Sequence, residues 1–142
     1  MVQIVIMVIG MRLITFSVFG DNPLYCQGAV ENANIARVIY PDWTPRFYVA
    51  QDVPEHYIEE IEGYGAEVVR CEKKNSYDGL NWRFRPFLDK DVEYWISRDA
   101  DSRLSWRERN AVDEWIESDK AAHLLRDCHN HGYTIMAGMF GI

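Results

Sequence analysis

Short apolar runs alternate with amphipathic segments along most of this chain. Runs rich in β-branched and aromatic residues, bounded by turn residues, predict strands over residues 12–19, 46–50, 66–71, 93–97, 122–126 and 133–136. Apolar residues at helical spacing, with proline or capping signals at their ends, predict helices over residues 23–40, 54–62, 80–88 and 105–117. Because strands and helices alternate, we expect an α/β fold with a mostly parallel sheet flanked by helices.

The last of these helices has the clearest start signal. Ser105 is followed three residues later by Glu108, which is the spacing of a capping box. In such a box the serine hydroxyl accepts a hydrogen bond from the Glu108 backbone N–H. Val112 and Trp115 then share the face that we expect to pack on the sheet.

The two ends of the chain differ from the rest. Residues 1–10 are apolar, but they are too few to span a bilayer and lack the basic start of a signal peptide. We expect no transmembrane segment, and we interpret these residues as an extra leader or edge strand before one domain over residues 11–142. The last predicted strand has no helix after it. We therefore expect a partner subunit in an oligomer, or further protein chain, to complete that sheet edge.

Composition and charge narrow the class of protein. At 142 residues, 48% hydrophobic and 26% charged, the chain is expected to form one globular domain. Its net charge of −7 argues against a nucleic-acid partner, because nucleic acids select basic surfaces. The three cysteines are widely spaced and include no Cys-x-x-Cys pair. This favours reduced thiols in a cytoplasmic protein over a disulfide framework or a zinc site.

The most informative residues are two aspartates that follow the predicted strand over residues 93–97. Asp99 and Asp101 are separated by one residue, so in an extended chain their side chains point the same way. Two converging carboxylates repel each other and favour a cation. Hard divalent ions such as Mg²⁺ and Mn²⁺ prefer oxygen ligands, and they commonly bind one or two carboxylates together with substrate phosphates.

Four interpretations of this aspartate pair compete. A calcium-binding EF-hand loop fails, because its sixth and twelfth positions hold Leu104 and Asn110 instead of glycine and glutamate. A haloacid-dehalogenase-type phosphohydrolase would use Asp99 as nucleophile. In that family, however, the aspartate pair is usually followed by Gly-Thr and lies near the start of the chain, whereas here Ser102 and Arg103 follow it late in the chain. The other two interpretations are a metal–diphosphate site and a solvated strand end that caps the next helix.

Neighbouring motifs favour the metal–diphosphate interpretation. In chain order they read SVFGDNPLYCQGAVENANIARVIYPDW (17–43), WRFRP (82–86), EYWISRDADSRL (93–104), RERNAVDEW (107–115), HLLRDCHNH (123–131) and GMFG (138–141). Together they resemble the small GT-A-type glycosyltransferase domains of bacteria and large algal viruses, over about residues 11–142. The resemblance implies a Rossmann-like GT-A fold. Since GT-A domains continue beyond the GMFG-like segment, we expect this chain to be the N-terminal part of one.

The resemblance implies a metal-dependent glycosyltransferase. A sugar would pass from a UDP- or GDP-linked donor to a glycan or other hydroxyl acceptor, with Mn²⁺ or Mg²⁺ as cofactor. Asp101 would be the main metal ligand, and Asp99 would face the ribose or reach the metal through water. Asp127 would either contact hydroxyls of the donor sugar or act as the catalytic base toward the acceptor. A catalytically silent nucleotide-sugar-binding fragment is the alternative from another class.

Further donor-binding candidates lie near the first strand and in the WRFRP segment. Ser17, Phe19 and Asn22 follow the carboxyl end of the first strand, where ligands bind in open α/β sheets, although a simple turn has the same composition. Arg83, like Arg85, has a guanidinium suited to pyrophosphate. An ion pair with Asp89 or Asp91 explains either arginine equally well.

Three more features complete the set of candidates. Arg98 is expected to pair with a neighbouring carboxylate and so to orient the metal site. The histidines of the HLLRDCHNH segment lack the acidic partner spacing of a zinc site, so we expect a donor or acceptor loop there. Gly138 and Gly141 permit close backbone approach on the acceptor side.

Overall fold

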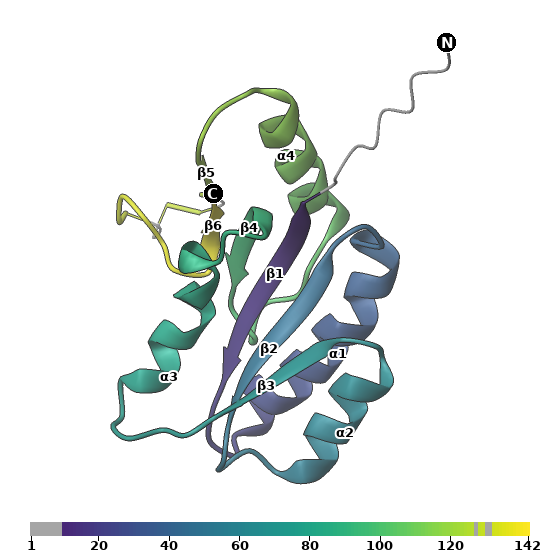
Figure 1. Ribbon diagram of the computed structural model, residues 1–142, viewed down its shortest axis with the longest axis vertical. Coiled ribbons are helices and arrows are strands. Elements are labelled where there is room, and N and C mark those ends of the chain that lie inside the picture. Colours follow the sequence, from purple (N-terminus) through teal and green to yellow (C-terminus); the bar gives the residue numbers. More distant parts are fainter. Residues whose placement is uncertain (1–9, 127, 130–131) are drawn as a thin grey trace.

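Within the residues that the structure describes, six strands form one sheet with helices on both faces (Figure 1). The computed structural model describes residues 10–126, 128–129 and 132–142. The strands are β1 (Met11–Val18), β2 (Thr44–Ala50), β3 (Glu67–Cys71), β4 (Val92–Arg98), β5 (His123–Leu124) and β6 (Met139–Gly141). The helices are α1 (Pro23–Ile39), α2 (Glu55–Gly63), α3 (Asp78–Asn81), the 3₁₀ helix η1 (Trp82–Leu88) and α4 (Trp106–Glu117). The prediction of an α/β fold is confirmed.

The sheet is mixed: three of its five strand pairs are parallel, in line with the expected mostly parallel sheet, and two are antiparallel. Its strand order is β3-β2-β1-β4-β6-β5. The pairs β1–β2, β1–β4 and β2–β3 are parallel, whereas β6 runs antiparallel to both β4 and β5. Parallel pairing requires a long crossover, usually a helix. Among the described residues no helix follows β5, so the chain returns to the sheet in the antiparallel direction.

The strand order reverses between β1 and β4. From β1 the chain moves outward through α1 to β2 and through α2 to β3, and then crosses back to place β4 on the other side of β1. The carboxyl ends of β1 and β4 therefore meet at a point where the connections leave in opposite directions. In open α/β sheets such a switch point leaves a crevice in which ligands bind.

Alternating residues of β1 serve the two faces of the sheet. Ile14, Phe16 and Val18 are buried in the larger core, together with apolar residues of α1, α2 and α4. The Phe16 ring stacks on Phe47 of β2 with a centroid separation of 4.6 Å. Thr15 and Ser17 face the opposite side of the sheet, where both form hydrogen bonds with Arg83 of η1. The central strand thus joins a helical layer on one face to the short α3–η1 segment on the other.

Several predicted elements differ from those observed. The helix predicted over residues 80–88 is one turn of α3 followed by η1, in which Pro86 lacks the backbone donor that a continuing α-helix needs. The strand predicted over residues 133–136 is wrong: Tyr133 and Ile135 are exposed there, and β6 is the strand that pairs with β4. Phe140 of β6 packs on the Trp95 ring, which helps to explain why residues 139–141, and not residues 133–136, pair with β4.

The chain ends also differ from the prediction in placement. The final strand, β6, lies between β4 and β5, so it is not a sheet edge. The expected leader or edge strand falls on residues 1–9, outside the described residues, apart from Gly10. In the described part of the chain, no helix has both the length and the apolar character needed to cross a membrane. The three cysteines, all of them described, are unpaired.

His123 of β5 is a buried titratable side chain. Its ring stacks on Trp115 of α4 with a centroid separation of 5.3 Å, and its Nε2 has no hydrogen-bond partner among the described residues. Burial, reinforced by the nearby charge of Arg98, lowers the pKa of His123 to about 4 from its ordinary value of 6.5. The folded protein therefore holds this imidazole neutral at pH values where the unfolded chain protonates it.

This difference predicts a loss of stability on mild acidification. Between about pH 6.5 and 4 unfolding takes up a proton at His123, so the free energy of unfolding falls as pH drops, by at most about 1.4 kcal/mol per pH unit. We expect His123→Phe, which retains a stacking ring, to flatten this dependence in urea denaturation. His56→Gln, at an exposed histidine, is the control. Equal slopes for wild type and His123→Phe would contradict the assignment.

Candidate functional site

A cavity of about 420 Å³ lies where the carboxyl ends of β1 and β4 meet. We call it the β1–β4 cavity, and its lining comprises Ser17, Phe19, Gly20, Asp21, Asn22, Tyr25, Leu80, Arg83, Asp99, Ala100 and Asp101. This lining includes all six residues that the sequence predicts to bind the donor or the metal, namely Ser17, Phe19, Asn22, Arg83, Asp99 and Asp101. They come from β1, the β1–α1 turn, η1 and the loop after β4. Their chemical roles stay predictions.

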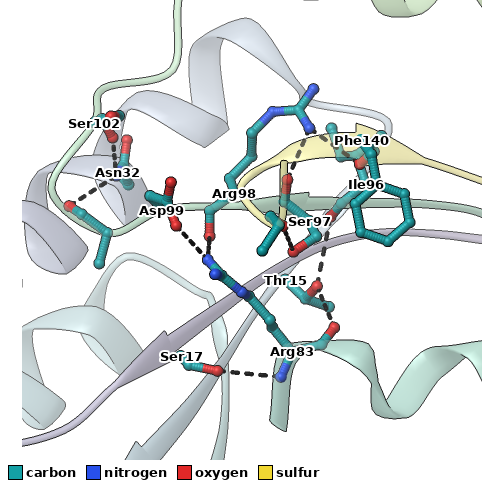
Figure 2. A network of polar contacts seen from close by, with 12 residues as sticks. Thr15, Ser17, Asn32, Arg83, Ile96, Ser97, Arg98, Asp99, Ser102 and Phe140 are labelled. Carbon is teal, nitrogen blue, oxygen red and sulfur yellow. Dashed lines mark hydrogen bonds and ion pairs between the residues drawn. The ribbon is translucent and has the colours of Figure 1, made fainter. Parts of the chain in front are cut away.

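The loop that carries the two aspartates is held by one buried side chain of α1. Asn32 is fully buried, and its Nδ2 donates to the Ser102 carbonyl at 2.8 Å. The Asn32 Oδ1 accepts from the Leu104 backbone N–H at 3.0 Å (Figure 2 draws the Ser102 contact). A Cβ on Gly28, one turn earlier on α1, would overlap the Ala100 carbonyl. Helix α1 and the aspartate loop therefore pack closely.

Polar residues of β1 anchor η1 over the sheet (Figure 2). The Thr15 hydroxyl donates to the Arg83 carbonyl at 2.8 Å and accepts from the Trp95 indole N–H at 2.6 Å. The Arg83 backbone N–H donates to Ser17 Oγ at 3.1 Å. The backbone of Arg83 is thus fixed from both sides by alternate residues of one strand.

The side chain of Arg83 reaches from η1 to the end of β4. Its Nη1 donates to the Arg98 carbonyl at 3.1 Å and forms an ion pair with Asp99 Oδ1 (Figure 2). The Arg83 side chain is 10% exposed and that of Asp99 is 44% exposed. Neither Asp89 nor Asp91 is the partner, so the ion pair proposed from the sequence exists with a different carboxylate. Arg83 fixes the direction of Asp99 at the cavity wall.

Phe19 forms a supported flat wall of the cavity. The Lys73 ammonium lies 5.6 Å from the centroid of the Phe19 ring, and it also pairs with Asp52 at 2.5 Å. Asp52 in turn accepts from the Gly20 backbone N–H at 2.8 Å, in a turn where Gly20 has a φ of +76°. On the other side, a Cβ on Gly79 would overlap the Phe19 ring. The ring is therefore held in place for stacking.

The two carboxylates are suited to contribute part of a cation's coordination sphere. Asp101 is exposed, and its side chain has no hydrogen bond or ion pair within the described residues. Asp99 has one oxygen engaged by Arg83, which leaves Oδ2 for another contact. In the described part of the chain, no three His, Cys, Asp or Glu residues are arranged so that they could hold a metal ion by themselves. Remaining ligands would have to come from water and from a ligand's phosphates, which is common for Mg²⁺.

A second cavity, also of about 420 Å³, lies on the other side of Asp99. We call it the α4 cavity, and its lining comprises Arg98, Asp99, Ser102, Arg103, Ser105, Arg107, Glu108, Ala111, Leu125, Arg126, Met136, Gly138 and Met139. Asp99 is common to both linings. A Cβ on Gly138 would overlap the Asp99 carboxylate, so the chain passes directly over this side chain.

Arg98 pairs with a carboxylate, as expected, and the partner is Glu108 of α4. Arg98 Nε donates to Glu108 Oε1 at 2.6 Å, and the Tyr40 hydroxyl donates to the same oxygen at 3.1 Å. Burial, together with the Glu108 charge, raises the pKa of Tyr40, so the phenol stays a donor. Ser105 Oγ accepts from the Glu108 N–H at 3.3 Å. Only one of the two hydrogen bonds of the capping box is therefore present, the one that Ser105 accepts. The Glu108 side chain binds Arg98 instead of the backbone N–H of Ser105.

The remaining sequence candidates have different outcomes. Asp127 and His131 lie outside the described residues. His123 is buried against Trp115, and His129 is exposed. Arg85 does not line either cavity: its Nη1 contacts Cys71 Sγ at 3.3 Å, and its guanidinium lies over the Tyr48 ring.

Sequence reasoning missed the residues that support the site from below. Asn32 is a polar residue on the apolar face of α1, which is a signal that an amphipathic helix pattern contains. Thr15 is a polar position in an otherwise apolar strand, two residues before Ser17, which the sequence did predict as a donor-binding candidate. Tyr25 and Gly79 carry no comparable signal, because their positions depend on how α1 and α3 pack.

Comparisons with known proteins do not assign the chain. Neither a protein-family model nor a curated protein matches it.

Removing the Asn32 amide is expected to loosen the aspartate loop. Asn32→Ala leaves the Leu104 N–H and the Ser102 carbonyl without their partner, which should lower the free energy of unfolding by about 2–3 kcal/mol. The matched control is Asn34→Ala, at an exposed asparagine of the same helix. Urea denaturation measures both variants, and amide hydrogen exchange at Leu104 reports the loop directly. Equal stabilities would contradict this role of Asn32.

Proposed function

We propose that this protein is a metal-dependent glycosyltransferase that moves a sugar from a nucleoside-diphosphate sugar to a hydroxyl acceptor. One observation carries the proposal: the predicted donor and metal residues, which are far apart in the sequence, surround one cavity at the β1–β4 switch point. Open α/β sheets bind nucleotides at such points. The sequence resemblance to GT-A domains supplies the reaction, and the cavity supports it.

The β1–β4 cavity has complementary groups for each part of a donor. Phe19 and Tyr25 are aromatic walls on which a base can stack. Ser17 Oγ already accepts a hydrogen bond, so its own proton can be donated to a ribose or phosphate oxygen. Asn22 uses Oδ1 to cap α1 through the Leu24 N–H at 3.0 Å, which leaves its amide hydrogens for a ligand. The α1 N-terminus beside it favours negative charge.

The aspartates of the loop are suited to the diphosphate end. We assign Asp101 as the main ligand of Mn²⁺ or Mg²⁺, because it is exposed at the cavity and not engaged by another described residue. Asp99, oriented by Arg83, is assigned to the ribose or to a water on the metal. The bound cation would neutralise negative charge that develops on the departing nucleoside diphosphate.

The acceptor side follows from the shared position of Asp99. A donor in the β1–β4 cavity and an acceptor in the α4 cavity would meet beside this carboxylate. Transfer also requires a group that takes the acceptor proton, and Asp127 stays our candidate for that catalytic base. We further propose a cytoplasmic location, since the unpaired cysteines are typical of a reducing compartment.

The ion pair of Asp99 distinguishes this proposal from a phosphohydrolase. A nucleophilic aspartate needs a reactive carboxylate, whereas Arg83 forms an ion pair with the negative charge that both oxygens of Asp99 share. Arginine pairing stabilises the anion and lowers its reactivity. We therefore expect no covalent phosphate on Asp99 when the protein is incubated with phosphate esters, as checked by intact-protein mass spectrometry.

Titration calorimetry with a nucleoside diphosphate tests the proposed donor site. We expect UDP or GDP to bind the wild-type protein in the presence of Mn²⁺, and Asp101→Ala to weaken this binding at least about tenfold, since a direct metal ligand is lost. Asp91→Ala removes an equal charge at an exposed position outside both cavities and is the matched control. Unchanged affinity in Asp101→Ala would exclude the metal site. Transfer from a panel of nucleotide sugars then distinguishes an enzyme from a silent binder.

A backbone position offers a second, independent test. Gly138→Ala places a methyl group where the Asp99 carboxylate lies, so we expect it to displace Asp99 and weaken metal–nucleotide binding on the order of tenfold, about 1.4 kcal/mol. Gly132→Ala is the control, because a Cβ there meets no atom within 4 Å. Circular dichroism checks that both variants remain folded. If Gly138→Ala binds like Gly132→Ala, the position of Asp99 does not matter for the ligand.

A further inference from the structure

The α4 cavity is unusually cationic for a protein of net charge −7. Its lining includes four arginines and two carboxylates, which are Arg98, Arg103, Arg107, Arg126, Asp99 and Glu108. They come from the end of β4, the loop after it, the first turn of α4 and the segment after β5. The arginines therefore converge from separate parts of the chain and are not a single basic run.

Ion pairing leaves two of these arginines available. Arg98 is neutralised by Glu108, and Arg103 pairs with Glu31 of α1 at 2.5 Å. Asp99, the other acidic residue of the lining, is paired with Arg83 from outside the cavity. Arg107 and Arg126 are exposed, and neither has an acidic partner within the described residues. Among the described residues the charges of the paired groups cancel, so Arg107 and Arg126 make the electrostatic potential in the cavity positive.

Two further features favour an anion at this place. Arg126 is positioned by its own chain, since its Nη2 donates to the Thr134 carbonyl at 3.1 Å, which leaves other guanidinium N–H groups for a ligand. The cavity also includes Ser105 and Arg107, at the N-terminus of the 12-residue helix α4. The positive end of the helix dipole adds to the arginine charges.

We propose that the α4 cavity binds an anionic group, a phosphate or a carboxylate, and that this group belongs to the acceptor. The binding of an anion follows from the cavity alone, whereas its assignment to the acceptor rests on the proposed function. The acceptor would then be a hydroxyl compound that also carries negative charge, with its hydroxyl directed toward Asp99 and its anionic group held by Arg107 and Arg126. Neutral acceptors lack this second contact.

Glycerol 3-phosphate is a suitable probe, because it combines hydroxyl groups with a phosphate, and glycerol is its neutral counterpart. D-glycerate supplies the carboxylate version. Binding is followed by amide shifts in ¹H–¹⁵N spectra, with and without saturating UDP and Mg²⁺. We expect both anionic probes or one of them to bind, glycerol not to bind measurably, and binding to persist beside the nucleotide. Displacement of glycerol 3-phosphate by UDP and Mg²⁺ would overturn the proposal, because the phosphate would then occupy the donor cavity.

Charge-removing variants locate the anion. Arg107→Gln and Arg126→Gln are each expected to weaken the binding of the anionic probe about threefold, and the double variant at least about tenfold. Arg37→Gln removes the same charge from an exposed position on α1, away from both cavities, and should bind like wild type. Wild-type affinity in the double variant, or equal binding of glycerol and glycerol 3-phosphate, would overturn the proposal.

The outcomes separate this inference from the proposed function. Glycosyl transfer to neutral acceptors without any binding of the anionic probes would overturn the anion site and leave the glycosyltransferase proposal intact. Binding of the anionic probe by Arg107 and Arg126 in a protein that binds neither UDP nor GDP with a metal would support the anion site and contradict the donor site.

Discussion

The contact of Arg83 with the end of β4 is the interaction on which the site depends. Its backbone is fastened to β1 through Thr15 and Ser17, and its side chain reaches the Arg98 carbonyl and Asp99. A short 3₁₀ helix would otherwise have little hold on the sheet. One residue thereby joins both strands of the switch point and sets the direction of the carboxylate between the two cavities.

The loop after β4 is fixed from the opposite face by Asn32. This arrangement matters because the loop contains an exposed carboxylate, Asp101, whose position cannot be set by burial. Asn32 binds the backbone instead, so the loop conformation is held without using the charged groups themselves. Arg83 above and Asn32 below are therefore complementary: the first orients a side chain, and the second fixes the main chain that carries both aspartates.

Much of the fold was predictable because its signals are local. The apolar runs of β1 to β4, the capping serine at Ser105 and the helical spacing of α1 all act within a few residues. The strand β6 was not predictable, because three residues become a strand only through pairing with β4 and packing on Trp95. The same limit applies to the site. Motifs indicated the aspartates and Arg83, but the pairing of Arg83 with Asp99 depends on how η1 docks on β1.

The two cavities place a constraint on charge at Asp99. This carboxylate lies between a cavity that also contains Asp21 and Asp101 and a cavity whose Arg107 and Arg126 have no acidic partner among the described residues. A diphosphate bound in the β1–β4 cavity would add negative charge beside Asp99 and Asp101. A divalent cation bound there can offset this charge, but it does not act in the α4 cavity. Arg83 neutralises the charge of Asp99 itself. The arginines of the α4 cavity are therefore needed neither to neutralise Asp99 nor to offset the charge of a diphosphate. Their charge is left to act on a ligand of the second cavity, and this division explains why an acidic protein would concentrate arginines there.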